Sequence, residues 1–339
     1  MSSTWIAASS LPAEPVATAD AGTRMIWYAT VARWAPSKHN TQPWRFVESK
    51  GSLDVWADPL RVLVDTDPHR RELLISCGAA VHLACVAARA LGHRPHVRLL
   101  PEGRGGPVAR IEEVGPWDTS EDDRSLLAAV QHRRTDRGPL DGHSLPASLP
   151  FSLQSAASAH GAVLRLVSTV GDRATLADLV TRADRLLVRH GHVDDELTGW
   201  LREPDDRRPD GVPTDHTRGA AASYRAEFVQ RDFSSIRSQP APSRSHPDTP
   251  VVGVLCTPAD RAEDWLVAGQ ALGAVLLLAT VAGAHASYLN QPVEEPSIRV
   301  QLRDQLQLDG VAQLILRIGV GSEVTPTPRR DVDEVTFRA

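Results

Sequence analysis

WAPSKHNTQPWRF, residues 34–46, places two prolines on either side of a short polar segment. Pro36 disfavours helical backbone at Ala35, so a preceding helix ends there, and Pro43 restrains the far side. The amides and hydroxyls between the prolines need hydrogen-bond partners. The edge of a planar, hydrogen-bonding ring would supply them; the alternative is an ordinary polar turn leading into a strand, WRFVES.

Composition indicates a soluble globular protein. The 339 residues suffice for one large domain or two ordinary ones, and 42% are hydrophobic while 23% are charged. The formal net charge of −5 gives no basic field for a polyanion, so we expect no nucleic-acid partner. Arginine far outnumbers lysine, and clustered arginines can still bind a single phosphate.

Cysteine usage and the N-terminus both favour the cytoplasm. Cys77, Cys85 and Cys256 form no CxxC pair and leave an odd number, which argues against a disulfide framework. The N-terminal residues lack a basic segment followed by a continuous apolar run, so we expect no secretory signal. We therefore predict a mobile tail over 1–22 and a cytoplasmic protein.

One segment is long and apolar enough to suggest a membrane span. No charged residue occurs from Trp265 to Val293. The segment is nevertheless rich in alanine and glycine, contains Gln270 and His285, and has no flanking positive cluster. We therefore predict a buried core helix and no membrane partner.

Two helical segments resemble each other. Asp67-Pro68 predicts the start of a helix over 68–91 that Gly92 ends. GAAVHLACVAARALG (78–92) and GQALGAVLLLATVAG (269–283) share glycines at both ends and alanines at the third and eleventh positions. A strand-like run follows each helix, so we predict an internal duplication, with chance similarity among alanines as the alternative.

Other segments complete the predicted organisation. SLLAAVQHRRTDRGPL (125–140) predicts a helix ending in an arginine cluster, and the proline-rich stretch 203–250 is typical of a lid, binding loop or linker. The predicted division is a tail at 1–22, a first half at 23–120, and a second half at 121–339 that includes the lid at 203–250 and a C-terminal arm at 322–339.

Several common catalytic and nucleotide-binding motifs are absent from the sequence. It contains no GxxxxGK[ST], GxSxG, HExxH or GxGxxG motif of the expected context. His190, His192, Asp194 and Asp195 could bind a metal in principle, but a solvated polar helix face is the favoured interpretation, so we predict no metal site.

Two patterns instead fit a phosphorylated flavin. An isoalloxazine ring offers acceptors at N1, O2 and O4 and a donor at N3, which match the groups of the polar segment. Arg133, Arg134 and Arg137 in RRTDR could bind a phosphate by bidentate, charge-assisted hydrogen bonds. The alternative for RRTDR is a solvated basic turn paired with Asp136 and Asp141.

Three motifs resemble those of the nitroreductase superfamily. APSKHNTQPWRF matches its flavin-binding segment, APSxxNxQPWxF, and RRTDR resembles the RRSxR element that grips the FMN phosphate. PRRDVDEV, with Arg329 and Arg330, is similar to the late arginine that joins this phosphate. Because APSKHN here precedes RRTDR, the order resembles the Acg-type branch of internally duplicated chains.

The resemblance implies an α+β, nitroreductase-like fold in which two tandem halves form a pseudo-dimer around one FMN, with a lid in the second half. Backbone groups of SYLNQP (287–292) would lie near flavin N5. The implied cofactor-binding residues are Pro36, Ser37, Lys38, Asn40, Gln42, Trp44, Arg133, Arg134, Thr135, Arg137, Leu289, Asn290, Arg329 and Arg330.

The implied activity is NAD(P)H-dependent reduction of a nitro compound, quinone or similar small molecule, with the chemistry residing in the flavin, so no side chain is assigned as acid or base. An alternative is FMN storage under a lid that prevents turnover. A weaker alternative is a tailoring oxidase that uses oxygen. The chain would act as a monomeric pseudo-dimer or as a homodimer.

Overall fold

The computed structural model describes residues 11–16, 18–103, 105–189, 192–203, 205–214, 227–228, 248–322 and 324–339, without the side chains of 188–189 and 192–194. Most of the predicted lid at 203–250 and about half of the tail at 1–22 lie outside the described residues. The described part of the tail contacts the fold, because Leu11 N donates to Gln131 Oε1 at 3.3 Å.

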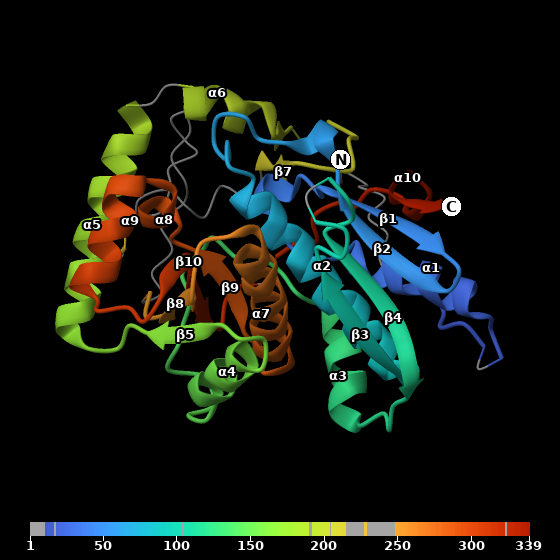
Figure 1. Cartoon of the computed structure of the whole chain (residues 1–339). Coiled ribbons are helices and arrows are strands. Elements are labelled where there is room, and N and C mark those ends of the chain that lie inside the picture. Colours follow the sequence, from blue (N-terminus) through green and yellow to red (C-terminus); the bar gives the residue numbers. More distant parts are fainter. Residues whose placement is uncertain are drawn as a thin grey trace.

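The N-terminal part of the chain forms a helix–strand–strand–helix–strand–strand unit (Figure 1). Its elements are α1 (Ala21–Ala32), β1 (Trp44–Ser49), β2 (Ser52–Ala57), α2 (Arg71–Ala90), β3 (His93–Leu99) and β4 (Ala109–Pro116). The four strands are antiparallel neighbours in the order β1-β2-β4-β3. The strand predicted from WRFVES is confirmed as β1.

The second unit follows the same order. Its elements are α4 (Leu149–Ser158), β5 (Val163–Leu166), β8 (Val251–Thr257), α7 (Ala262–Val281), β9 (His285–Tyr288) and β10 (Val311–Gly319). Its strands are again antiparallel neighbours, in the order β5-β8-β10-β9. The two units therefore share element order and sheet topology, and the mixed α+β class predicted from the sequence is confirmed.

The remaining elements connect or cover these units. They are η1 (Lys38–Asn40), η2 (Pro59–Arg61), α3 (Glu121–Val130), α5 (Val170–Arg189), α6 (His192–Gly199), β6 (Leu201–Arg202), β7 (Val212–Pro213), α8 (Gln291–Glu294), α9 (Pro296–Gln305), α10 (Val332–Val335) and β11 (Thr336–Arg338). β11 pairs in parallel with β1, so the C-terminal arm completes the edge of the first sheet.

Helices α2 and α7 pack against each other between the two sheets (Figure 1). They cross at Gly78 and Gly269, where the backbones approach so closely that any side chain would collide. A Cβ on Gly78 would lie 2.2 Å from Leu266 O, and one on Gly269 would lie 2.1 Å from Ile75 O. These glycines are the first residues of the two similar segments, so the crossing joins matching positions of those segments.

Both α2 and α7 are long and apolar enough to cross a membrane by length and composition. In the fold, however, 83% of the most apolar window of α2 and 67% of that of α7 are buried. The segment beginning at Trp265 therefore forms a core helix, as predicted.

Two predicted helix boundaries differ from those in the structure. α2 begins at Arg71 rather than residue 68 because Arg70 has a left-handed φ of 59°; the Asp67 carboxylate still accepts from Leu73 N at 2.8 Å. The helix predicted over 125–140 is α3, which ends at Val130. Beyond it the chain runs beside β9, where Asp136 N donates to Ala286 O at 2.9 Å, so RRTDR lies after the helix rather than inside it.

Candidate functional site

The loop between α1 and β1 has an unusual backbone. His39, Asn40 and Gln42 have φ values of 50°, 54° and 50°, a left-handed region that residues other than glycine rarely occupy. Such strain persists only where neighbouring groups over-determine it, and it is typical of functional sites. The Ser37 hydroxyl provides one constraint by accepting from Gln42 N at 2.9 Å.

Asn40 links this loop to two distant segments. Its Nδ2 donates to Gly211 O at 3.0 Å and to Pro328 O at 3.1 Å, and its Oδ1 accepts from Arg329 Nη1 at 3.1 Å. The side chain is 7% exposed, so these bonds form away from water. Asn40 thereby holds the segment 205–214 and the C-terminal arm against the loop.

Gln42 and Arg330 reinforce the same junction. Gln42 Oε1 accepts from Arg330 N at 2.8 Å, and Gln42 Nε2 donates to Pro209 O at 2.7 Å. The Arg330 guanidinium lies 3.6 Å from the Asp58 carboxylate, and its Nη1 also donates to Gln42 O at 3.3 Å. Gln42 and Arg330 therefore hold the loop and the arm together.

The RRTDR turn brings together one buried arginine, Arg133, and two half-buried ones, Arg134 and Arg137. Arg133 is 6% exposed, and its Nε and Nη1 atoms are buried without a hydrogen-bond partner among the described residues. Arg134 is satisfied in part, since its Nη1 donates to Gln131 O at 2.7 Å. A buried guanidinium with unsatisfied donors is costly, so the turn is suited to an anion that the protein itself does not supply.

The C-terminal arm adds Arg329 to this cationic cluster. Burial lowers the pKa of Arg329 well below its ordinary value, and the neighbouring charges of Arg133, Arg134 and Arg33 lower it further. Burial also lowers the pKa of Arg133 and of Arg137. The electrostatic neighbours of Arg329 are thus other arginines, and a bound dianion would relieve their repulsion.

A cavity lies between the loop, the arginine turn, α2, α7 and the arm, with about 1320 Å³ of space free of protein atoms, including the part open to solvent. Ten of the predicted cofactor-binding residues line it. They are Pro36, Ser37, Lys38, Asn40, Arg133, Arg134, Thr135, Arg137, Asn290 and Arg329. Motifs about a hundred residues apart in the sequence, and the arm near the C-terminus, therefore meet at one place.

Four predicted residues are not among those that line the cavity. The Trp44 side chain is fully buried in the first core beside Phe46, and Leu289 packs in the core of the second unit while its N–H donates to Ile315 O at 3.0 Å. Gln42 and Arg330 instead hold the loop and the arm. Asn290 lines the cavity, but its Oδ1 accepts from Ile315 N at 3.0 Å and so fixes β10.

Several lining residues were not predicted from the sequence. Glu72 and Ser76 come from α2, Leu272 from α7, and Tyr288 and Glu294 from the segment around SYLNQP. Lys38 Nζ forms an ion pair with Glu72, lies 3.4 Å from Glu294 Oε1, and donates to Thr66 O at 3.0 Å. Glu72 and Glu294 belong to no recognisable sequence motif, so the sequence does not predict their pairing with Lys38. Tyr288 lies within SYLNQP, the segment that the resemblance placed near the flavin.

Among the described residues, no group of three or more histidine, cysteine, aspartate or glutamate side chains could hold a metal ion. His190, and the side chains of His192 and Asp194, lie outside the described part. The three cysteines are buried and free, and burial raises the pKa of Cys85 to about 11.

Comparisons with known proteins give relatives that match most of the chain. A Mycobacterium tuberculosis (strain H37Rv) protein named "Putative NAD(P)H nitroreductase Rv3131" is 33% identical over 313 residues, covering 90% of this chain and 89% of the relative. "Putative NAD(P)H nitroreductase acg" from the same organism is 29% identical over 307 residues, covering 89% of this chain and 91% of the relative. No family model matches the sequence.

Among solved structures, a chain described as a putative nitroreductase from Anabaena variabilis has a TM-score of 0.42 and 13% identity, covering 80% of this chain and 69% of that chain. The family assignment follows from the sequence relatives, whose similarity covers about nine tenths of the chain. The chain belongs to the nitroreductase superfamily, in the branch that includes acg of Mycobacterium tuberculosis.

Proposed function

We propose that the chain binds FMN in this cavity and catalyses the NAD(P)H-dependent reduction of a nitro compound, a quinone or a similar acceptor. The observation that carries the proposal is Arg133, whose buried Nε and Nη1 have no partner among the described residues. A phosphate monoester offers oxygen acceptors and about two negative charges, which suit Arg133 and the adjacent Arg329.

The remaining lining residues fit the rest of the cofactor. Ser37 and the strained backbone of the loop would contact the ring and ribityl side, whereas Thr135 and Arg137 would lie toward the phosphate. Leu272 and Ile75 supply apolar surface between these ends. Most of the other lining side chains are polar or charged, which suits a cofactor that carries a phosphate, hydroxyl groups and a hydrogen-bonding ring edge. The residues present therefore fit FMN.

Bound FMN would supply the redox chemistry, taking two electrons from a nicotinamide and passing them to the acceptor. The role of the chain would be to position the cofactor and to shield it from solvent. Arg133 and Arg329 would fix the phosphate, the Asn40 bonds would hold the loop closed on it, and Tyr288 would form part of the wall beside the arginines.

We also propose that the chain is an internally duplicated pseudo-dimer with one flavin site. The shared order of the two units and the Gly78–Gly269 crossing support this. The first unit contributes the loop, and the second contributes the arginine turn and the arm, so each half would be incomplete alone. Buried free cysteines and buried apolar helices accord with a cytoplasmic protein.

An absorption spectrum tests the main proposal. Purified protein should show the yellow flavin bands, and release of the cofactor by denaturation should yield FMN by chromatography. Addition of NADPH or NADH under nitrogen should bleach the bands, and a quinone should restore them. A protein that neither retains nor takes up FMN would contradict the assignment of the cavity.

FMN storage is the second candidate, and it is favoured by the segment 205–214. Gly211 N donates to Asn40 O at 3.2 Å, Val212 lines the cavity, and Asp210 lies 2.7 Å from Arg61 Nη1. This segment would restrict access of a nicotinamide to the flavin. Deletion of 205–248 should then accelerate bleaching by NADPH; an unchanged rate in a variant that still holds FMN would argue against occlusion.

A further inference from the structure

An ion-pair network lies in the wall of the cavity. Lys38 Nζ is paired with Glu72 from α2 and with Glu294 from α8, and the three side chains are only 6–10% exposed. Arg71 also contacts this network, because its Nη2 lies 3.4 Å from Glu72 Oε1. The network thus joins the loop to elements of both units.

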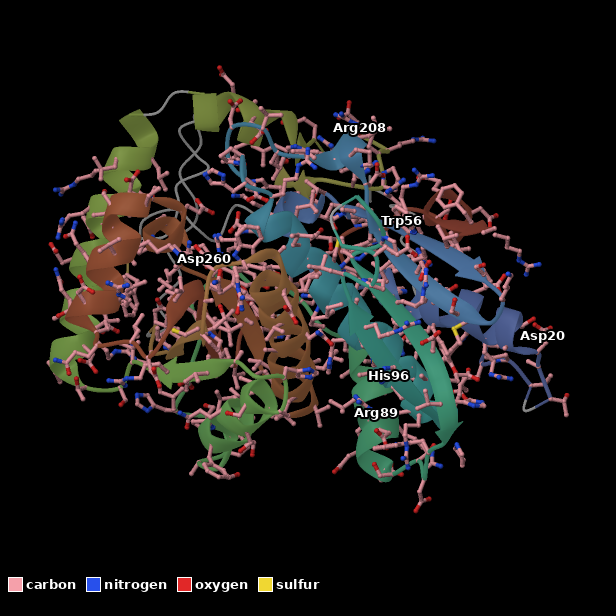
Figure 2. The ribbon with its side chains drawn as sticks, viewed as in Figure 1. Asp20, Trp56, Arg89, His96, Arg208 and Asp260 are labelled. Carbon is pink, nitrogen blue, oxygen red and sulfur yellow. The ribbon has the colours of Figure 1, made fainter. Side chains whose placement is uncertain are left out.

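On the other side of this wall is a large open groove. Trp56 and Asp260, labelled in Figure 2, line it from the two units, and about 3590 Å³ between its walls is free of protein atoms, including the part open to solvent. Glu294 lines both the cavity and the groove. Thr66 and Asp67, which flank the network, also line the groove. Ionisable groups therefore extend from the enclosed cavity to solvent.

The cavity has a chemical need for such a connection. Reduction of a quinone or a nitro group adds protons as well as electrons to the acceptor. The arginines of the cavity are poor proton donors, because a guanidinium is the most basic side chain in proteins and a bound phosphate would hold it in the charged form. A lysine ammonium can act as a general acid, and an adjacent carboxylate that exchanges protons with water can restore its proton.

We propose that Lys38 donates a proton to the acceptor oxygen during reduction and is reprotonated through Glu294 from the groove. This inference rests on the proposed FMN-dependent reduction. The Nζ–H bond breaks as the O–H bond forms, while the two electrons and the other hydrogen come from the reduced flavin. Glu294, which is a carboxylate in the ion pair, then takes a proton from water in the groove and passes it to the neutral Nζ, which balances each two-electron turnover.

The charges around Lys38 suit this role. Glu72 and Arg71 face it from α2, Glu294 from α8, and Asp67 from the turn before α2. Burial and the charge of Glu72 raise the pKa of Asp67 to about 6, so one carboxyl at the groove side can exchange protons near neutral pH.

Two conservative variants separate proton delivery from structure. Lys38→Arg keeps the positive charge and both ion pairs but cannot release a proton, and Glu294→Gln keeps the shape of the relay but removes its acid. Glu263→Gln, on the exposed side of α7, is the control. For each protein the flavin is reduced with dithionite under nitrogen and then mixed with benzoquinone, which takes up protons, or with ferricyanide, which takes only electrons.

We expect both test variants to lose at least about tenfold in the reoxidation rate with benzoquinone relative to that with ferricyanide, with an altered pH profile, since a positioned acid contributes roughly 10²–10⁴-fold. The FMN affinity of Glu294→Gln, measured by quenching of flavin fluorescence, should change by less than about threefold, on the order of 0.7 kcal/mol, and Lys38→Arg is compared at saturating FMN. An unchanged ratio of the two rates, or an equal loss with both acceptors, would overturn the relay.

A second readout needs no cofactor. Infrared spectra of the FMN-free protein, recorded between pH 4 and pH 9, should contain a titrating carboxyl band that Glu294→Gln removes and Glu263→Gln retains. A band unaffected by Glu294→Gln would contradict proton exchange at this residue. If instead the wild type binds no FMN while the band is present, the proposed cofactor fails and the proton exchange of the network stands.

Discussion

The side-chain oxygen of Asn40 accepts a hydrogen bond of 3.1 Å from Arg329, 289 positions later in the chain. The bond connects the loop of the first unit with the C-terminal arm, and the Asn40 amide also holds Gly211 and Pro328. One buried side chain therefore assembles three segments that are remote in sequence. Loop geometry, arm docking and the position of the cationic cluster should accordingly change together.

Asn40→Ala should release this junction. Loss of three buried hydrogen bonds, together with an alanine forced into a left-handed conformation, should weaken FMN binding by at least about tenfold, since each bond contributes roughly 0.5–1.5 kcal/mol. Fluorescence titration measures the affinity, and limited proteolysis should cut the arm faster. Gln154→Ala, which removes one bond to Leu164 O in the second unit, is the control and should change neither result.

Arg133→Met should have opposite effects on the protein and on the complex. Removal of a buried cation with unsatisfied donors should raise the free energy of unfolding of the FMN-free protein by about 1–3 kcal/mol. Removal of charge-assisted bonds to the phosphate should weaken FMN binding by about tenfold to a hundredfold. Urea denaturation and fluorescence titration measure the two quantities.

The exposed Arg124→Met on α3 is the control for Arg133→Met, because its ion pair with Glu121 at 3.8 Å is open to solvent and contributes little. A loss of stability in FMN-free Arg133→Met would show that the protein itself supplies hydrogen-bond partners to Arg133, so that the side chain needs no bound anion.

Gly78→Ala should disrupt the packing of α2 on α7. The added methyl would lie 2.2 Å from Leu266 O, which is backbone and cannot move aside, so we expect a loss of at least about 3 kcal/mol or a failure to fold. Gly171→Ala in α5 has nothing within 4 Å of the new methyl and should be neutral or slightly stabilising. Thermal unfolding compares the two; similar melting temperatures would contradict the close crossing.

The local motifs predicted much of the site, and its long-range contacts escaped prediction. RRTDR and APSKHN, which the sequence analysis interpreted as a phosphate clamp and a ring-binding loop, both line one cavity. Trp44 belongs to the same motif, yet it packs in the core, because alternation along β1 turns its side chain inward. Glu72 and Glu294 were not predicted, since their pairing with Lys38 depends on how three elements meet.

Helix ends were predicted less well for a related reason. Asp67 was identified as a cap, and its carboxylate does accept from Leu73 N, but the left-handed Arg70 between them delays the helix. The helix expected to reach RRTDR stops at Val130 because pairing beside β9 replaces helical hydrogen bonds. Tertiary contacts of this kind override local propensity and leave no trace in a sequence window.

Asp67 predicts the pH dependence of stability. Burial, with the neighbouring Glu72, raises the pKa of Asp67 from 3.8 to about 6 in the folded protein. The folded state therefore binds more protons than the unfolded state between these values, so the contribution of Asp67 to the free energy of unfolding falls as pH rises from about 4 to 6.

Asp67→Asn cannot ionise, and its amide oxygen can still accept from Leu73 N. Urea denaturation at several pH values should accordingly show a less negative slope for Asp67→Asn than for the wild type in this window, with equal slopes above pH 7. Parallel curves throughout would show that Asp67 titrates alike in the folded and unfolded states, and that the network beside Lys38 does not include it.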